Sequence, residues 1–139
     1  MLVRPESITT LGHIIADATS AANISLRFTM SEIRLTLNNT QTVSKGVSNN
    51  AWQLVTFRYD GANLQLGVNE APGASGGSTT AAYSTAIASL ANAVRVGGNI
   101  GGAFFNGQIA ELALSDQAFD DATFARVQAY ANARYALSL

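Results

Sequence analysis

One stretch, residues 52–69, constrains the fold of this chain more than any other. Apolar side chains occupy every second position there, on both sides of the turn sequence Asp60-Gly61-Ala62-Asn63. This alternation predicts two half-buried strands, and the turn residues between them predict that the strands pair as a hairpin. In the first of these strands, Trp52, Leu54 and Thr56 fall on the face opposite to the one that carries Val55, Phe57 and Tyr59. The positions expected to point into a core are Val55, Phe57, Tyr59, Leu64, Leu66 and Val68.

Further short segments with strand character surround this hairpin and are separated by Gly, Asn and Ser. Several short strands divided by turn residues are typical of an all-β sandwich. Residues 97–102 are expected to form a glycine-rich loop, and residues 72–80 a surface loop. In residues 81–93 we expect an irregular strand with Tyr83 and Ile87 pointing inward. The other predicted strands are Leu11–Ala16, Ile24–Thr29, Ile33–Leu37, Val43–Val47, Val94–Gly97 and Phe104–Leu114.

One helix is predicted near the C-terminus, at about residues 120–135. Asp120 suits the N-cap position, and Phe119 and Phe124 occupy the two positions of a hydrophobic staple. Apolar residues recur along one stripe of this helix, so we expect that stripe to pack on the sandwich. The stripe consists of Phe124, Val127, Ala131 and Tyr135.

The composition limits the classes of partner. The chain has 139 residues, which is room for one domain at residues 1–139. It contains no cysteine, so neither a disulfide nor a thiolate metal site is available. Its eight basic residues are dispersed and its net charge is −1, which argues against a nucleic-acid partner. No apolar run is long enough to span a membrane, and the N-terminal residues lack the pattern of a signal peptide.

Charged residues make up only 12% of the chain, about half the usual share in soluble domains. Two interpretations fit this low charge. The surface can be neutral and rich in Asn and Thr, or neighbours in an assembly can cover much of it.

Four ordered motifs resemble one known family. Residues 52–69 resemble the central hairpin of concanavalin A-like lectin/glucanase domains of the laminin-G-like kind. Residues 94–98, 105–112 and 114–118 resemble three later segments of that family, the last of which leads into its closing helix. The resemblance implies an all-β, two-sheet antiparallel jelly-roll sandwich with one C-terminal α-helix packed on it.

The same resemblance suggests the structural core. Trp52 matches the core tryptophan of the family. Glu111 matches an acidic residue that ties the sandwich to the helix, and we expect it to pair with Arg126 or Arg134. The complete set of expected core residues is Trp52, Phe57, Tyr59, Ile109, Glu111 and Phe124.

Full-length members of this family carry further strands ahead of the segment that Leu2-Val3-Arg4 resembles. A sandwich that lacks strands exposes unpaired backbone and apolar surface, which another chain can cover. We therefore predict a homo-oligomer, with a trimer as first guess, or a place among the proteins of a larger particle. The residues expected at or near the contact are Met1, Leu2, Val3 and Arg4.

No constellation of catalytic groups appears in the sequence. Glucanases use paired carboxylates, which alternate residues of one strand can supply, but no predicted strand has such a pair. Glu32, Glu70 and Glu111 are isolated, and His13 lacks a partner at motif spacing, so we interpret it as a half-buried strand residue. Phosphate-binding and calcium-binding loop patterns are also missing. The sequence therefore predicts a protein that is not an enzyme and has no cofactor and no metal site.

Two functions fit these observations best. The first is a structural module of a larger assembly, such as a decoration or tail-associated protein of a phage virion. The second is a glycan-binding module of a secreted or fibre protein, although asparagine also suits turns without any ligand. An inactive remnant of a hydrolase is a third. We expect the protein in a virion or at an extracellular surface. The asparagines that would bind surface glycans are Asn38, Asn39, Asn69, Asn99 and Asn106.

Overall fold

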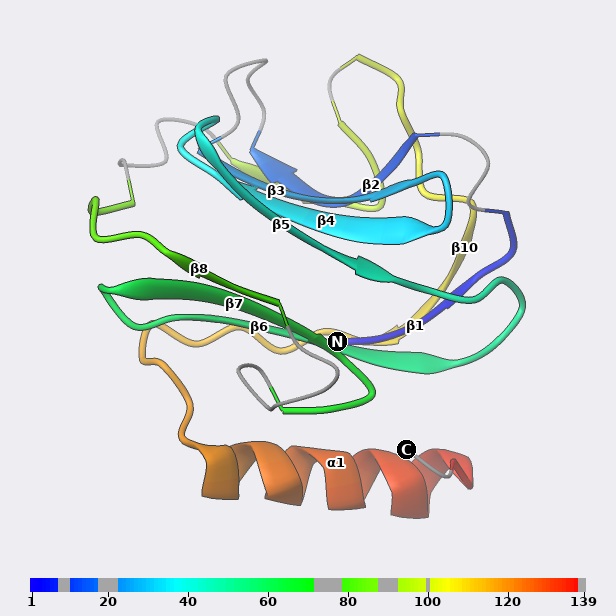
Figure 1. Cartoon of the computed structure of the whole chain (residues 1–139). Coiled ribbons are helices and arrows are strands. Elements are labelled where there is room, and N and C mark those ends of the chain that lie inside the picture. The colour runs from blue at the N-terminus through cyan, green and yellow to red at the C-terminus, as the bar shows by residue number, and fades with distance from the viewer. Residues whose placement is uncertain (8–10, 18–22, 72–78, 88–92, 100, 138–139) are drawn as a thin grey trace.

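The computed structural model describes residues 1–7, 11–17, 23–71, 79–87, 93–99 and 101–137. Two five-stranded antiparallel sheets face each other, and one helix lies beneath the lower sheet (Figure 1). This arrangement confirms the predicted all-β sandwich with a C-terminal helix. The apolar faces of the two sheets meet, as expected for aligned sheets that share one core.

The lower sheet consists, in spatial order, of β10 (Gly107–Glu111), β1 (Leu2–Pro5), β6 (Gln53–Tyr59), β7 (Asn63–Val68) and β8 (Thr79–Ala82). Its β6–β7 hairpin is the predicted one. At the turn, Gly61 adopts a φ of 87°, and Asp60 Oδ1 accepts hydrogen bonds from the amides of Ala62 and Asn63 at 2.9 and 2.7 Å. These bonds lower the pKa of the Asp60 carboxyl.

The upper sheet consists, in spatial order, of β5 (Gln41–Gly46), β4 (Glu32–Leu37), β3 (Ile24–Thr29), β2 (Gly12–Asp17) and β9 (Val94–Val96). A two-residue turn joins β3 to β4, and its residues Met30 and Ser31 have φ values of 43° and 74°. Positive φ at both turn positions is typical of tight hairpins. Residues at equal distances from this turn therefore face each other across the two strands.

The core lies between the two sheets and is built from alternate residues of the strands, except in β2, where a register shift between His13 and Ile15 allows the consecutive residues Ile14 and Ile15 both to enter it. Side chains at these positions are almost fully shielded from solvent, as the period-two pattern predicts. Its buried members are Val3, Ile14, Ile15, Leu26, Phe28, Ile33, Leu35, Leu37, Val43, Val55, Leu64 and Leu66.

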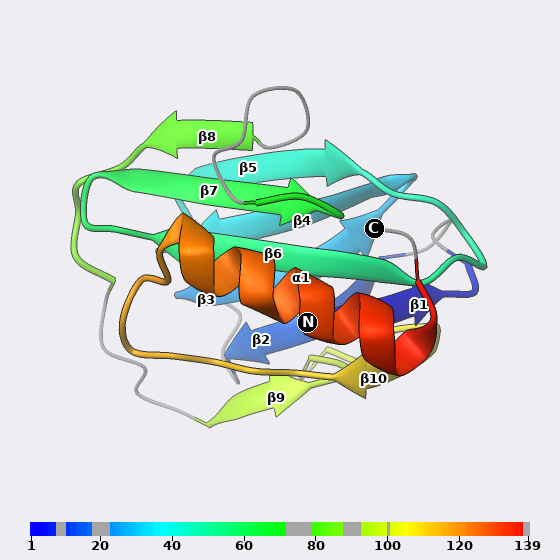
Figure 2. The ribbon, with the colours of Figure 1, turned by 90° about the horizontal axis from the view of Figure 1, so that it is seen from below.

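The helix α1 (Asp121–Tyr135) crosses the outer face of the lower sheet (Figure 2). Asp120 is its N-cap, as predicted, and its Oδ1 accepts a hydrogen bond from the Thr123 amide at 2.7 Å. Hydrogen bonds from Thr123 lower the pKa of the Asp120 carboxyl. Phe124 and Ala131 are the buried residues of the helix, so the predicted stripe does face the sheet.

Glu111 joins the sandwich to this helix. Its Oε1 accepts hydrogen bonds from the hydroxyls of Tyr130 and Tyr135 at 2.7 and 2.8 Å, and it forms an ion pair with Arg134 at 3.2 Å. The hydroxyl bonds, and then Arg134, lower the pKa of Glu111. The predicted tie is confirmed with Arg134, whereas Arg126 bonds within the helix.

Trp52 lies outside the core between the sheets, which corrects the prediction for this residue. It is partly buried, and its ring stacks on the ring of Tyr135 with 6.4 Å between centroids. Its position on the face opposite Val55 directs it toward the helix. Phe124 is buried on the helix side as well. The predicted core residues that do pack against the inter-sheet cluster are Phe57, Tyr59 and Ile109, each partly buried.

The predicted strand Phe104–Leu114 is wrong in its bounds, because only the five residues of β10 form a strand. Before β10, the ring of Phe105 turns inward and stacks on Phe28 with 5.3 Å between centroids. At Gly107 a Cβ atom would lie 2.4 Å from the carbonyl oxygen of Arg4, so the backbone approaches β1 there as only glycine permits.

The prediction for residues 81–93 is only partly confirmed. A regular strand, β8, precedes most of this region, and Tyr83 packs against the core cluster as expected. Ile87 lines the rim of the hollow between the sheets and is 39% exposed, so it is not buried in the core. Residues 88–92 and 72–78 lie outside the described residues.

β1 occupies the interior of the lower sheet, paired with β10 on one side and β6 on the other. Leu2 and Val3 are 2% and 0% exposed within the chain itself. β1 therefore has neighbours on both sides and is not an edge strand. Contact of these residues with another chain stays a prediction.

Candidate functional site

Among the described residues, part of β6 has a paired strand on only one side. Val55 exchanges two backbone hydrogen bonds with Met1, at 2.8 and 2.9 Å. Successive residues of an antiparallel strand direct their backbone groups to opposite neighbours, so Thr56 and Arg58 face β7. Phe57 and Tyr59 therefore direct their N–H and C=O groups to the side beyond Met1. Among the described residues, no strand pairs with β6 there.

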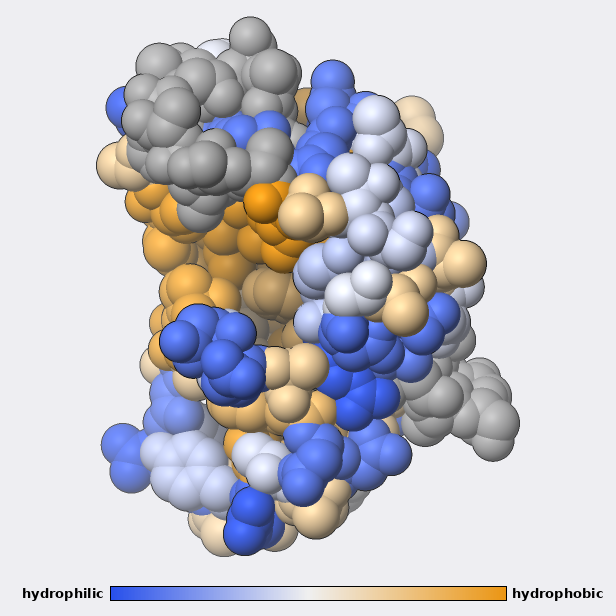
Figure 3. All heavy atoms as spheres, turned by 90° about the vertical axis from the view of Figure 1, so that its left-hand side faces the viewer, coloured by the Kyte–Doolittle hydropathy of each residue, from blue (hydrophilic) through white to orange (hydrophobic). Residues whose placement is uncertain are grey.

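An apolar hollow of about 410 Å³ opens between the sheets beside this edge. Figure 3 shows it as a depression with a hydrophobic floor on the side of the molecule that faces the viewer. Its size is that of a small-ligand pocket, and it can accommodate several apolar side chains. The inward-facing residues that line it include Ile15, Ile24, Leu35 and Leu37 from the upper sheet and Val55, Phe57, Tyr59 and Leu64 from the lower sheet.

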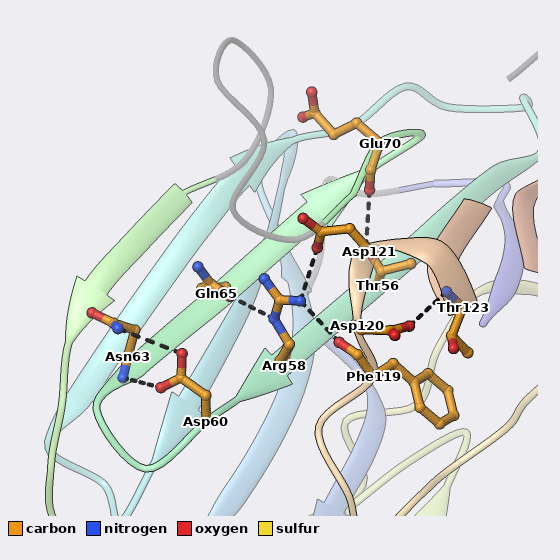
Figure 4. Close-up of polar contacts among 10 residues, drawn as sticks. All are labelled: Thr56, Arg58, Asp60, Asn63, Gln65, Glu70, Phe119, Asp120, Asp121 and Thr123. Atoms are coloured by element: carbon orange, nitrogen blue, oxygen red, sulfur yellow. Dashed lines mark hydrogen bonds and ion pairs between the residues drawn. The ribbon is translucent and has the colours of Figure 1, made fainter.

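Residues 113–119 line the hollow and connect β10 to α1 without regular secondary structure. Arg58 fixes the end of this segment (Figure 4). Its Nη1 donates to the carbonyl oxygen of Phe119 at 2.8 Å and to Asp121 at 2.9 Å, and its Nε donates to Gln65 at 2.7 Å. The Arg58 side chain is only 19% exposed, so these charge-assisted bonds are partly shielded from water.

The asparagines predicted to bind glycans do not form one site. Asn38 uses its Nδ2 to donate to the Tyr83 hydroxyl at 2.7 Å, and Asn69 accepts a hydrogen bond from the Leu54 amide at 2.8 Å. Asn99 accepts one from the Ala103 amide at 2.9 Å, while Asn39 and Asn106 are exposed. The first three stabilise local backbone or join separate elements, and they share no common partner. Glycan binding by the five stays a prediction.

A row of polar side chains crosses the outer face of the upper sheet instead. His13 on β2 lies opposite Arg27 on β3, Arg27 opposite Arg34 on β4, and Arg34 opposite Ser44 on β5. The residues before and after Arg27 and Arg34 are buried in the core, so these arginines must face outward. We call His13, Arg27, Arg34 and Ser44 the cationic row.

Several polar atoms on this face are buried but have no hydrogen-bond partner. Within the described residues they include Nδ1 of His13, Nε of Arg27 and of Arg34, and Oγ of Ser25. Buried polar atoms are normally paired, so such a group needs an explanation. Burial, and then the charge of Arg27, lowers the pKa of His13, so His13 is neutral at pH 7. The two arginines therefore carry the charge of the row.

The comparison with family models decides the relationship that the geometry suggests. The model of the concanavalin A-like lectin/glucanases superfamily matches residues 1–124. The chain belongs to this superfamily. Comparisons with curated proteins and with solved structures found no match. Membership in the superfamily suggests a carbohydrate-binding or a structural module. Laminin-G-like domains are generally non-catalytic, although the superfamily also includes glucanases.

The acidic residues of this superfamily member have structural partners at most positions. Glu32, Glu70, Glu111 and Asp121 each form an ion pair with a basic side chain. The described residues contain no group of three or more His, Asp or Glu residues that could hold a metal ion. Among them there is also no helix with both the length and the apolar character needed to cross a bilayer.

Proposed function

We propose that this protein is a non-catalytic structural module that enters a larger assembly by accepting an extended strand of another chain along β6. The observation that supports the proposal is that a strand edge with free backbone groups and an apolar hollow lie next to each other. The backbone groups of Phe57 and Tyr59 lie on a strand edge that no strand in the described part of the chain pairs with, and the apolar hollow opens beside that edge. An added strand would pair with the first and cover the second.

The geometry of the ladder defines the partner segment. It would continue the pairing that Met1 begins with Val55, antiparallel to β6, and would exchange hydrogen bonds with Phe57 and Tyr59. Alternate side chains of such a strand would point into the hollow and should be apolar. The opposite side chains would face the helix side.

The setting that we propose is a virion or another surface assembly, which agrees with the low charge of the chain. If a second copy donates the strand, the contact is head-to-tail, and such contacts form a closed ring when the rotation between copies closes and an open filament when it does not. A trimer is then the first expectation. If another particle protein donates it, the isolated chain is a monomer that gains the strand on assembly.

Hydrogen exchange of individual amides tests the proposal. In the isolated monomer the amides of Phe57 and Tyr59 should exchange quickly, whereas those of Thr56 and Arg58, which face β7, should be protected. In an oligomer of this chain, or with an added partner segment, all four should be protected. If Phe57 and Tyr59 stay unprotected in every assembled form, strand addition along β6 is wrong.

Charge placed at the rim of the hollow gives a second test. Leu114 lines the hollow and is 59% exposed, so Leu114→Lys should leave the fold intact and weaken assembly. Met30, which is 80% exposed in the β3–β4 turn, supplies the matched control Met30→Lys. Equal loss of assembly in both variants, measured by light scattering, would argue for a general effect of charge.

A second candidate function, glycan binding, is favoured by a different surface. The cationic row and the exposed Thr42 beside it place guanidinium and hydroxyl groups on the outer face of the upper sheet, and groups of these kinds hydrogen-bond to sugars. Glycan-array binding by the isolated chain tests this candidate, and variants of the hollow should not change it.

A further inference from the structure

The hollow beside β6 is not confined to the space between the two sheets. Side chains from both faces of β6 line it, because Phe57 packs against the inter-sheet core whereas Arg58 points to the helix side and bonds to Asp121. Phe124 and Val127 of α1 line the same hollow, and Phe124 is only 6% exposed. The hollow therefore passes the edge of β6 and extends from the inter-sheet core to the helix.

The place beside this edge is the continuation of β1. β1 lies between β6 and β10, and residues 113–119, which follow β10, also line the hollow. Figure 2 shows the N-terminus between β6 and β10, with this segment continuing past it on the side away from β6. We call the place in line with β1, between β6 and residues 113–119, the open position. No strand of the described residues occupies it.

The pairing of Met1 with Val55 fixes where each side chain of a strand in the open position would point. Residues that lie opposite each other on neighbouring strands share one face of the sheet. Counted back from Met1 along the line of β1, the second and fourth residues would lie opposite Phe57 and Tyr59 and point into the core. The first and third would point to the helix side. Both sets would therefore meet apolar surroundings.

The end of the open position at the β6–β7 turn is acidic. Four exposed carboxylates gather at the turn, along residues 113–119 and at the start of α1. They belong to Asp60, Asp116, Asp120 and Asp121. Figure 4 shows three of them near Arg58, which pairs with Asp121 at 2.9 Å. Besides Arg58, only Arg126 acts on Asp120, and only Arg58 acts on Asp60, so this end keeps an excess of negative charge.

We infer that the segment accepted by β6 is a short run of residues that are apolar on both faces, preceded by a basic residue that lies opposite Asp60. This inference rests on the proposed function and names the chemistry of its partner. Strands that are buried on both faces have nearly continuous apolar sequences and do not alternate. Opposite charges at directly opposed cross-strand positions are favourable, so the basic residue fixes the direction and register of the segment.

Segments joined directly ahead of Met1 test the inference, because they run in line with β1 and need no separate binding step. The test extension is a lysine followed by four valines. The matched extension has threonine at the two helix-facing positions, since threonine has nearly the shape of valine but carries a hydroxyl group. An extension of five serines gives the baseline.

With the valine extension, the amides of Phe57 and Tyr59 should become protected from hydrogen exchange, as they are not with the serine extension. Its melting temperature should be at least about 5 °C above that of the threonine extension, because a buried hydroxyl without a partner is unfavourable. Replacing the lysine by glutamate should lower the melting temperature by about 2–3 °C, and this difference should shrink at high salt. The same replacement two positions further ahead, beyond the turn, is the control and should have less effect.

The remaining outcomes distinguish this inference from the function on which it rests. If the valine and threonine extensions both protect Phe57 and Tyr59 and melt alike, strand addition along β6 stands, but the apolar helix-facing side of the partner is wrong. If glutamate serves as well as lysine, the basic residue is wrong. If no extension protects these amides, both the inference and the proposed function fail. Binding of dodecanoate by the unextended chain, together with that last result, would assign the hollow to a small apolar ligand.

Discussion

The two long sides of the sandwich differ. The two sheets contact each other along one side, whereas along the other side they leave a hollow that a partner strand can enter. On one side, β5 of the upper sheet lies against β7 and β8 of the lower sheet. Lys45 forms an ion pair with Glu70 at 3.4 Å there, and the Thr79 hydroxyl donates to the Ser44 carbonyl at 2.8 Å. On the other side, no strand of the described residues pairs with the edge of β6 at Phe57 and Tyr59, and the hollow separates the sheets. Polar links on the closed side hold the sheets together, so the open side can stay unfilled.

The largest expected effect comes from truncating the core near the closed side. Leu66 is fully buried and does not line the hollow, so Leu66→Ala should lower the free energy of unfolding by about 2–5 kcal/mol. Phe57 lines the hollow and is only partly buried, so Phe57→Ala should lower it by about 1–2 kcal/mol, although its side chain is larger. Urea unfolding measures both. Equal losses would show that the two sides are packed alike.

Enlarging a side chain should have opposite outcomes on the two sides. Val43 on β5 is buried and does not line the hollow, so Val43→Leu should overpack the core and lower the free energy of unfolding by about 1–3 kcal/mol. Val55 faces the hollow, so Val55→Leu should be tolerated without loss. Thermal melting of both variants checks this. A destabilised Val55→Leu variant would mean that the hollow has no space for the larger side chain.

Loss of the ion pair on the closed side should have the smallest effect. Lys45→Met should lower the free energy of unfolding by about 0.5–1 kcal/mol, and the loss should shrink at high salt. The double variant with Glu70→Gln should lose little more than the single variant. A loss above about 2 kcal/mol would assign the link a larger part in holding the sheets together than such pairs usually have.

Much of the fold could be predicted because strand and helix signals are local. The alternation around Asp60-Gly61 fixed the β6–β7 hairpin, and Asp120 marked the start of α1. The start of β10 could not be predicted, because it depends on the close approach of Gly107 to Arg4, which is distant in the sequence. β8 was missed since its four residues alternate too weakly to give a periodic signal.

The two candidate surfaces differ in how far the sequence could reveal them. Arg27 and Arg34 each stand between core residues and lie at equal distances from the two-residue turn. Their pairing across β3 and β4 could therefore have been predicted from the sequence. The hollow could not have been predicted from the sequence, because its position depends on which residues of β1 pair with which residues of β6. The sequence suggested a contact with another chain at or near Met1–Arg4, whereas β1 is paired on both sides and, among the described residues, the stretch without a paired strand is the adjacent part of β6.

Arg58 has a consequence for the speed of association. The segment of residues 113–119 is held at one end by Arg58 through Phe119 and follows β10, whose last residue, Glu111, is bonded to the helix, at the other. Because both ends of this segment are fixed, it need not change conformation when a partner strand binds. The loss of conformational freedom then falls on the incoming segment alone, and the receiving site is preorganised. Association should therefore be governed by the encounter of the two chains rather than by a slow rearrangement of this one.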